Sequence, residues 1–230
     1  MDNEKVGRRG EAYLLLLTSL IGMNLMAASA DLVMLYLAIE TTSIPLYVLS
    51  GFMLADEKST EAGFKYLLFG ALTSTVMLYG FSLTYGFTGT ADIYQLAGMF
   101  TSGDLSPLVA VGILALILVG LGFKVSVVPF HFWAPDVYEG APTPVAGFLS
   151  TASKAAGFAV LVRLFFAIFP DPQVEIARDW AMTLAIIAAI TMTVGNLLAL
   201  PQTNIKRLIA FSSVSHAGYA LIGVVALSQL

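Results

Sequence analysis

Long apolar runs make up most of the chain, and short polar segments separate them. A helix needs about 20 apolar residues to cross the hydrocarbon core of a bilayer. Seven runs reach that length, covering residues 12–29, 32–54, 62–86, 107–130, 143–169, 180–200 and 207–228. The pattern predicts an all-α integral membrane protein, a polytopic bundle of about seven transmembrane helices.

Composition supports this interpretation. The chain is 58% hydrophobic and only 11% charged, whereas soluble domains carry about 25% charged residues, and its mean hydropathy is +0.85. No cleavable signal peptide is visible, because the first ten residues are polar and the apolar run that follows continues past Met26. The last apolar run ends two residues before the end of the chain, so we expect a truncated gene or a fragment.

The distribution of basic residues predicts the orientation. Cytoplasmic loops of membrane proteins carry an excess of Lys and Arg. A cytoplasmic N-terminus, with alternating spans, leaves only Arg178 on the outer side. Six basic residues then lie inside: Lys5, Arg8, Arg9, Lys58, Lys206 and Arg207.

Several kinds of site are excluded or disfavoured. The chain has no cysteine, which rules out disulfides, thiolate metal sites and iron–sulfur ligation by Cys, and two His residues are too few for most metal sites. Gly120 and Gly122 are followed by Val125 where a dinucleotide-binding motif needs its third Gly. The net charge of -4 does not suggest nucleic-acid binding. We expect no cofactor, metal or nucleic acid on this chain.

Ionisable residues inside the predicted spans are the candidate functional residues, because a charge at the centre of a membrane helix costs about 2.5–3.5 kcal/mol. Glu40 lies mid-span, Lys124 two-thirds of the way along its span, and Lys154 centrally among small residues. A structural ion pair or a snorkelling side chain is the alternative explanation for each. The full set is Glu40, Lys65, Lys124, Lys154 and Arg163, with His131 and His216; Lys65 and Arg163 lie close enough to span ends to snorkel.

These residue types suit proton transfer. Burial disfavours the charged form of a lysine and a nearby carboxylate favours it, so a Glu40–Lys124 pair could hold or release a proton. His131 lies seven residues after Lys124, and His216 lies beside Ser212, Ser213 and Ser215. Histidine titrates near physiological pH and could relay protons. A hydrogen-bonded structural histidine is the alternative.

A Pro-rich segment covers residues 129–144. Its four prolines disfavour one continuous helix, so we expect a broken helix near 124–140. Broken helices bring unwound backbone to internal polar cavities. The alternative is a cytoplasmic loop that contributes aromatic residues to the membrane interface.

This segment and its flanks resemble a known family. The matching motifs are Gly122-Phe123-Lys124, Pro129-Phe130-His131, residues 133–144 in the form Trp-Ala-Pro-Asp-Val-Tyr-Glu-Gly-Ala-Pro-Thr-Pro, Ser153-Lys154, and residues 204–219. They are similar to the antiporter-like subunits of respiratory complex I, and the Pro-Asp-Val-Tyr-Glu-Gly form most resembles subunit N, the bacterial counterpart of mitochondrial subunit 2. The resemblance covers essentially the whole chain.

The resemblance implies an architecture and residue roles. It implies a single membrane domain, 1–230, with a first inverted repeat over 11–170 and a partial second repeat over 179–230. Glu40 and Lys124 would form a modulating pair, and Lys154 would be the lysine of the central axis. Lys65, His131 and His216 would support that polar axis. The broken helix of the second repeat and the distal charged residue of the exit route would be missing.

The resemblance also implies a function. The chain would be a proton-translocating subunit of NADH:quinone oxidoreductase, a translocase, without a redox site of its own. NADH, FMN, iron–sulfur clusters and quinone would belong to partner subunits. Other membrane subunits of complex I and the lipid bilayer would surround it in a bacterial inner membrane. The alternatives are a Na⁺/H⁺ antiporter subunit of the multi-subunit type and a non-transporting structural remnant.

Overall fold

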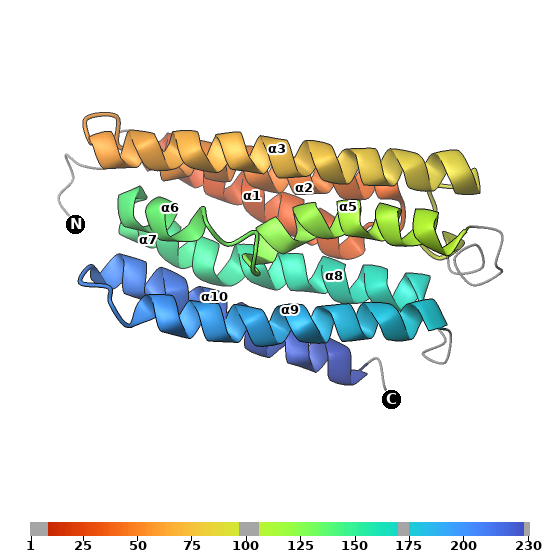
Figure 1. Ribbon diagram of the computed structural model, residues 1–230. Helices are drawn as coiled ribbons and strands as arrows, with labels where there is room; N and C mark the ends of the chain where they lie inside the picture. Colours follow the sequence, from red (N-terminus) through yellow and green to blue (C-terminus); the bar gives the residue numbers. More distant parts are fainter. Residues whose placement is uncertain (1–8, 97–105, 170–174, 228–230) are drawn as a thin grey trace.

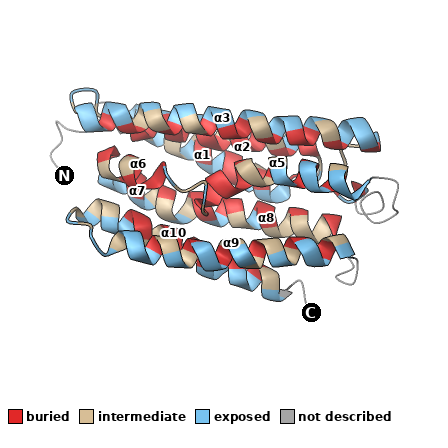
Figure 2. Cartoon of the chain, in the orientation of Figure 1, coloured by how far each residue is buried: buried red, intermediate tan, exposed pale blue. Residues whose placement is uncertain are grey.

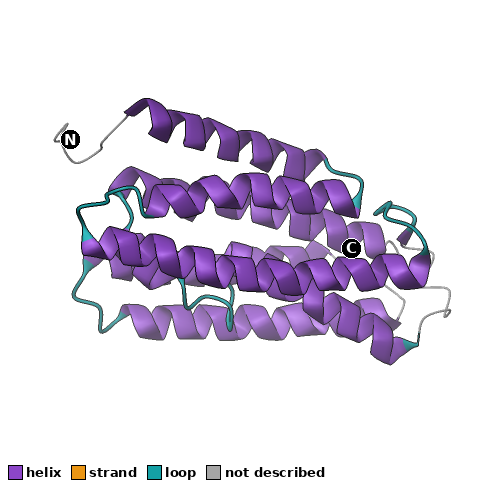
Figure 3. Ribbon diagram, turned by 90° about the horizontal axis from the view of Figure 1, so that it is seen from above, coloured by secondary structure: helices purple, strands orange, loops and turns teal. Residues whose placement is uncertain are grey.

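The computed structural model describes residues 9–96, 106–169 and 175–227, which form helices, turns and one isolated β-bridge between Asp31 and Asp92. In chain order the helices are α1 (Arg9–Ala28), α2 (Leu32–Ser50), α3 (Glu57–Thr88), α5 (Pro107–Val125), α6 (Ala134–Gly140), α7 (Thr143–Phe148), the π-helix η1 (Leu149–Ser153), α8 (Lys154–Ile168), α9 (Glu175–Ala199) and α10 (Ile205–Leu227). Figures 1 and 3 show the long helices side by side in one elongated bundle.

Seven helical segments are long and apolar enough to cross a bilayer, with α7, η1 and α8 forming one continuous span, Thr143–Ile168. The predicted all-α bundle with seven spans is therefore confirmed. Several predicted boundaries are wrong by a few residues, and α3 and α9 begin five residues earlier than the predicted spans, at Glu57 and Glu175. The second span ends at Ser50 rather than 54, and the fourth at Val125 rather than 130. The hydropathy pattern predicted both helix ends too late, because apolar residues continue past the point where the backbone leaves the helix.

The chain crosses the bundle repeatedly, so its connections gather at two ends. We call the end that holds α6, the α2–α3 loop and the α9–α10 turn the α6 end (Figure 1). The α1–α2 turn lies at the opposite end. There the Arg163 guanidinium donates to the Tyr94 hydroxyl from Nε at 3.1 Å and from Nη2 at 2.7 Å, and also to the Ala27 carbonyl. Arg163 thus ties α8 to α1 and to the segment that follows α3.

The expected broken helix is present, since α5 ends at Val125 and α6 begins at Ala134. Ser126 adopts a left-handed conformation with φ 62°. The N–H groups of Ser126 and Val127 donate to the carbonyls of Phe123 and Gly122 at 3.1 and 3.0 Å, the bonding pattern of a Schellman cap. The Trp133 indole N–H also donates to the Phe123 carbonyl at 3.1 Å. These bonds satisfy carbonyls that the helix end leaves free.

Buried residues follow the inward faces of the helices, and exposed ones lie outside (Figure 2). Exposed positions on α1 are large and apolar, for example Tyr13, Leu14 and Leu17, as expected for a surface that contacts lipid. Small residues let helices approach closely. At Gly195 on α9, a side chain would lie 2.7 Å from the Ser215 amide nitrogen of α10, so glycine there permits the tight α9–α10 contact.

Candidate functional site

Lys124 and Lys154 are the only charged side chains that are buried within the described parts of the chain, with exposed fractions of 5% and 6%. A charge buried at membrane depth is costly and needs polar partners. The surroundings of these two lysines therefore define the candidate site. Both were predicted from their position in apolar spans.

Lys124 lies in the last turn of α5, where the helix dipole favours a positive charge. Its Nζ donates to Ser43 Oγ on α2 at 2.8 Å. The Ser43 hydroxyl in turn donates to the Ile39 carbonyl at 2.7 Å. A small cavity of about 10 Å³ adjoins Lys124, which is about the space that one water needs.

Glu40 lies one turn before Ser43 on α2 and accepts a hydrogen bond from Ser74 on α3. Glu40 and Lys124 form no ion pair within 4.0 Å. The Glu40 carboxylate nevertheless acts electrostatically on Lys124, and Ser74 lines the Lys124 cavity. The structure thus places Glu40 beside a residue of the Lys124 cavity, Ser74, without direct contact between Glu40 and Lys124.

Lys154 begins α8 directly after the π-helical segment η1, a helix irregularity that is frequent at functional sites. Its Nζ donates to Ser213 on α10, to the carbonyl at 2.9 Å and to Oγ at 2.7 Å. A cavity of about 430 Å³ opens beside it and is lined by Ser212, Ser213 and His216, among others. The structure therefore brings Lys154 and His216 together.

The two histidines differ in setting. His131 lies in the turn between α5 and α6, and its Nδ1 is buried without a hydrogen-bond partner in the described structure. Burial lowers the pKa of His131, so the ring is neutral near pH 7. His216 on α10 packs edge-on against Tyr219, with ring centroids 5.7 Å apart. His131 does not line the cavities beside Lys124 or Lys154.

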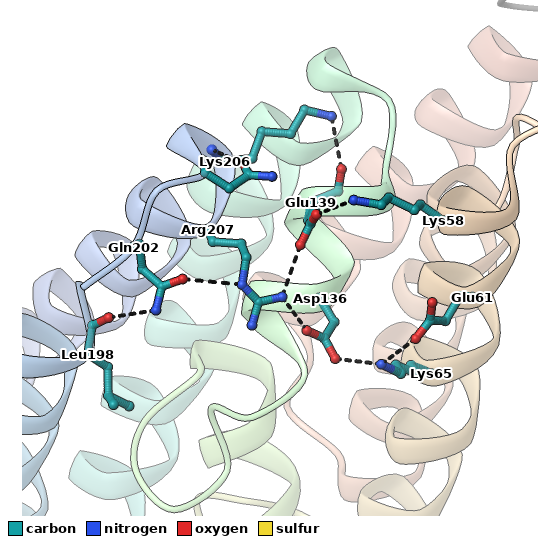
Figure 4. A network of polar contacts seen from close by, with 10 residues as sticks. Lys58, Glu61, Lys65, Asp136, Glu139, Leu198, Gln202, Lys206 and Arg207 are labelled. Atoms are coloured by element: carbon teal, nitrogen blue, oxygen red, sulfur yellow. Dashed lines mark hydrogen bonds and ion pairs between the residues drawn. The ribbon is translucent and has the colours of Figure 1, made fainter. Parts of the chain in front are cut away.

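Lys65 lies away from the two buried lysines, in an ion-pair network at the α6 end (Figure 4). Its Nζ lies 2.6 Å from both Glu61 and Asp136. Asp136 also pairs with Arg207 of α10 at 2.6 Å. The network therefore joins α3, α6 and α10. Lys65 is one-third exposed, so its role as a supporting residue of the proton axis stays a prediction.

Glu139 extends the same network. It accepts from Lys58 at 2.6 Å and from Arg207 at 3.0 Å, and these hydrogen bonds lower the pKa of its carboxyl. Burial acts to raise the pKa of Asp136, but hydrogen bonds from Lys65 and Arg207 outweigh burial and lower it. Both acids are therefore ionised at neutral pH and hold α6 between its neighbours.

Sequence reasoning missed the serine partners and the network. Ser43 stands three residues after Glu40, on the same helix face, and that spacing was a usable signal for it. Ser213 was noted only as a neighbour of His216. Lys58 and Arg207 were interpreted as loop charges. Among the described residues, no three His, Cys, Asp or Glu side chains gather as a metal site.

Comparison with known proteins gives a family match. The family described as "NADH:quinone oxidoreductase/Mrp antiporter, TM" matches residues 29–230. The NADH-quinone oxidoreductase subunit N 1 of Roseiflexus castenholzii is 51% identical, over 94% of this chain and 43% of its own length. Subunit N of Moorella thermoacetica is 50% identical, over 99% of this chain and 47% of its own length. The chain thus spans about half the length of these relatives.

Chains of three solved membrane complexes are similar to this chain in fold and sequence. A chain of respiratory complex I from Thermus thermophilus is similar with a TM-score of 0.78 and 40% identity, over 94% of this chain and 45% of that one. A chain of the archaeal membrane-bound sulfane sulfur reductase has a TM-score of 0.85 and 31% identity, over 96% and 45%. A chain of the Mrp complex from Dietzia has a TM-score of 0.80 and 27% identity, over 92% and 38%.

Proposed function

The chain belongs to the NADH:quinone oxidoreductase/Mrp antiporter transmembrane family, and from this membership we propose that it is subunit N of a NADH:quinone oxidoreductase and translocates protons. Its spans make it an integral membrane protein. The observation that carries the proposal is the pair of buried lysines, Lys124 and Lys154, each bound to a serine hydroxyl inside the bundle.

The surroundings of these lysines suit reversible protonation. A carboxylate in direct contact would hold the proton on a lysine, whereas a hydroxyl solvates the ammonium without neutralising it. Glu40 acts electrostatically on Lys124 without an ion pair, and Glu40 accepts a hydrogen bond from Ser74, which lines the Lys124 cavity. Movement of Glu40 toward or away from Lys124 would therefore change how firmly the lysine holds its proton. Energy for that movement would come from quinone reduction elsewhere in the complex.

The relatives favour quinone-linked pumping over cation antiport. Subunit N of Roseiflexus castenholzii and of Moorella thermoacetica are 51% and 50% identical to this chain, whereas the chain of the Dietzia Mrp complex is 27% identical. Because the Mrp chain has a similar fold, the fold alone does not distinguish a quinone-linked proton pump from a cation antiporter subunit. The function of a Na⁺/H⁺ antiporter subunit is therefore the weaker candidate.

The proposed setting is a bacterial inner membrane with the α6 end facing the cytoplasm. Lys58, Lys206 and Arg207 lie at the α6 end, and Arg178 lies in the first turn of α9 at the opposite end. Lys5 and Arg8, also assigned to the inner side, lie outside the described residues. Other membrane subunits would adjoin the chain, and NADH, FMN, iron–sulfur clusters and quinone would bind to partner subunits.

The proposed domain division is one membrane domain with a first repeat over 11–170 and part of a second over 179–230. The broken helix α5–α6 lies within the first repeat. Lys154 of the first repeat donates to Ser213 of the second. The Lys154 cavity therefore lies at the junction between the proposed repeats.

Single variants of the two lysines test the proposal. We expect Lys124→Ala and Lys154→Ala in the assembled complex to lower proton uptake by inverted membrane vesicles per quinone reduced. Lys58→Ala is the matched control, because Lys58 is 68% exposed. The amount of assembled complex is measured in each membrane. Undiminished proton uptake in both buried-lysine variants would contradict proton translocation through this chain.

A further inference from the structure

A side chain of α9 binds the backbone at the point where the helix α5 breaks off. The Val128 amide donates to the Thr191 hydroxyl oxygen at 3.0 Å, across 63 residues of sequence. Thr191 is fully buried and lies within the span Glu175–Ala199. A backbone amide at membrane depth must find its partner inside the protein. The turn after α5 is therefore tied to a helix of the proposed second repeat.

The Val128 amide is the donor that the cap of α5 leaves over. The amides of Ser126 and Val127 already bind carbonyls of the last helical turn, and Pro129 has no amide hydrogen. Val128 is therefore the one donor among residues 126–129 whose partner comes from another helix. Because a buried amide without a partner is strongly disfavoured, the break depends on an acceptor at position 191.

The threonine two positions further along α9 has a different arrangement. Thr193 is exposed, and its hydroxyl donates to the Ala189 carbonyl of its own helix at 2.8 Å. A threonine within a helix commonly makes this local bond, which needs no partner on another helix. Thr191 instead accepts a hydrogen bond from the turn after α5. The contact is therefore more than the ordinary behaviour of a helical threonine.

The same break carries Lys124, which only three residues separate from Val128. On α8, Gly157 lies against the aliphatic stem of this lysine, since a Cβ atom at position 157 would lie 3.2 Å from Lys124 Cγ. The Lys124 ammonium donates to Ser43 of α2 at 2.8 Å. Three helices thus support the lysine: α9 holds the turn that follows it, α8 packs against its stem, and α2 binds its ammonium.

We propose that Thr191 is a positioning residue for Lys124: its hydroxyl fixes the turn after α5 against α9 and so keeps the Lys124 ammonium on Ser43. The inference rests on the proposed function, to which it adds a residue that holds the buried lysine in place from the second repeat. Thr191 itself carries no transported proton. Without its hydroxyl, the Val128 amide loses its partner, the turn shifts, and the ammonium leaves the position that proton transfer requires.

Variants at position 191 separate the hydroxyl from the rest of the side chain. Thr191→Ser and Thr191→Ala both remove the methyl group and differ in the hydroxyl alone, whereas Thr191→Val keeps the branched shape and removes the hydroxyl. Thr193→Val is the matched control, because it removes an exposed hydroxyl from the same helix. The measurement is proton uptake per quinone reduced by vesicles that contain the assembled complex. We expect this ratio to fall in the alanine and valine variants of Thr191, and to keep the parental value in Thr191→Ser and Thr193→Val.

The ratio of protons to quinone distinguishes positioning from packing. A variant that only lowers the amount of complex lowers proton uptake and quinone reduction together, so their ratio does not change. Equal ratios in Thr191→Ser and Thr191→Ala would overturn the inference. If neither hydroxyl-free variant assembles while Thr191→Ser does, Thr191 serves the fold alone, and the inference is overturned as well.

Hydrogen exchange reports on the turn itself. The Val128 amide is held by a buried acceptor, so it should exchange slowly in the parent complex. We expect exchange in a peptide that covers residues 126–133 to be about tenfold faster in Thr191→Val, because a buried hydrogen bond is lost, and unchanged in Thr193→Val. Parental exchange in Thr191→Val would contradict a role of the hydroxyl in fixing the turn.

The proposed function and the role of Thr191 fail separately in these measurements. If Lys124→Ala and Lys154→Ala abolish proton uptake while Thr191→Ala and Thr191→Val keep the parental ratio, only the positioning role is wrong. If the two lysine variants take up protons normally, the proposed function is wrong, whatever the variants of Thr191 do.

Discussion

At the scale of single residues, the contrast between the two groups of lysines is the central feature. Lys124 and Lys154 are buried and bound to serines. Lys58 and Lys65 are more exposed and bound to carboxylates. Carboxylate partners hold a lysine charged, so the second group stabilises the fold, whereas the proposed function needs the first group to change protonation state.

The ion pairs of Asp136 give a pH-dependent stability. Hydrogen bonds from Lys65 and Arg207 lower the pKa of Asp136 in the folded protein. A carboxyl with a lowered pKa stabilises the folded protein at pH values above its unfolded-state pKa. This contribution is lost as the pH falls through the lower pKa of the folded state. Because Asp136 is one-third exposed, solvent screening limits the effect to about 1 kcal/mol.

We therefore expect Asp136→Asn to lower the unfolding free energy by about 1 kcal/mol at pH 7, and the difference from the parent to disappear between about pH 5 and pH 2. Thermal unfolding of the complex in detergent measures this. The control is Glu61→Gln, since Glu61 is 60% exposed and pairs within one helix; its effect should be smaller. A pH-independent difference for Asp136→Asn would refute the ion-pair explanation.

At the scale of helices, the break between α5 and α6 organises the site. The Schellman cap at Ser126 ends α5 one residue after Lys124, at Val125. The turn that follows positions Trp133 against Tyr66 and leads into α6. The break therefore places a lysine, an aromatic anchor and two network carboxylates in one short segment.

Substitutions at Ser126 test this cap. Left-handed backbone costs a side-chain-bearing residue about 1–2 kcal/mol, and glycine avoids that cost. We expect Ser126→Gly to be neutral or stabilising, and Ser126→Val, whose β-branched side chain fits the left-handed region poorly, to be less stable than the glycine variant by about 1–2 kcal/mol or more. Melting curves of the purified complex compare the two variants. Equal stability of the valine and glycine variants would be incompatible with the left-handed cap.

The sequence predicted helices better than it predicted their ends or partners. Apolar length alone placed seven spans, but the ends at Ser50 and Val125 depend on capping bonds that hydropathy does not include. Lys124 and Lys154 stood out because charge is rare in such runs. Their partners Ser43 and Ser213 lie 81 and 59 residues away in the chain, and no local pattern encodes those contacts.

At the scale of the whole molecule, each buried lysine adjoins its own cavity. The Lys124 cavity lies among α2, α3 and α5, and the Lys154 cavity lies between α8 and α10. Helix α6 contacts both α3 and α10, and the ion-pair network fixes it to both. The bundle thus holds the two lysines at a set separation.

The most direct test of this account is proton uptake per quinone reduced by vesicles that contain the complex with Lys154→Arg. Arginine keeps the positive charge but does not release its proton at physiological pH. We expect this variant to assemble and to lose proton uptake as completely as Lys154→Ala. Normal proton uptake with arginine at position 154 would show that the buried charge is structural and that Lys154 does not transfer protons.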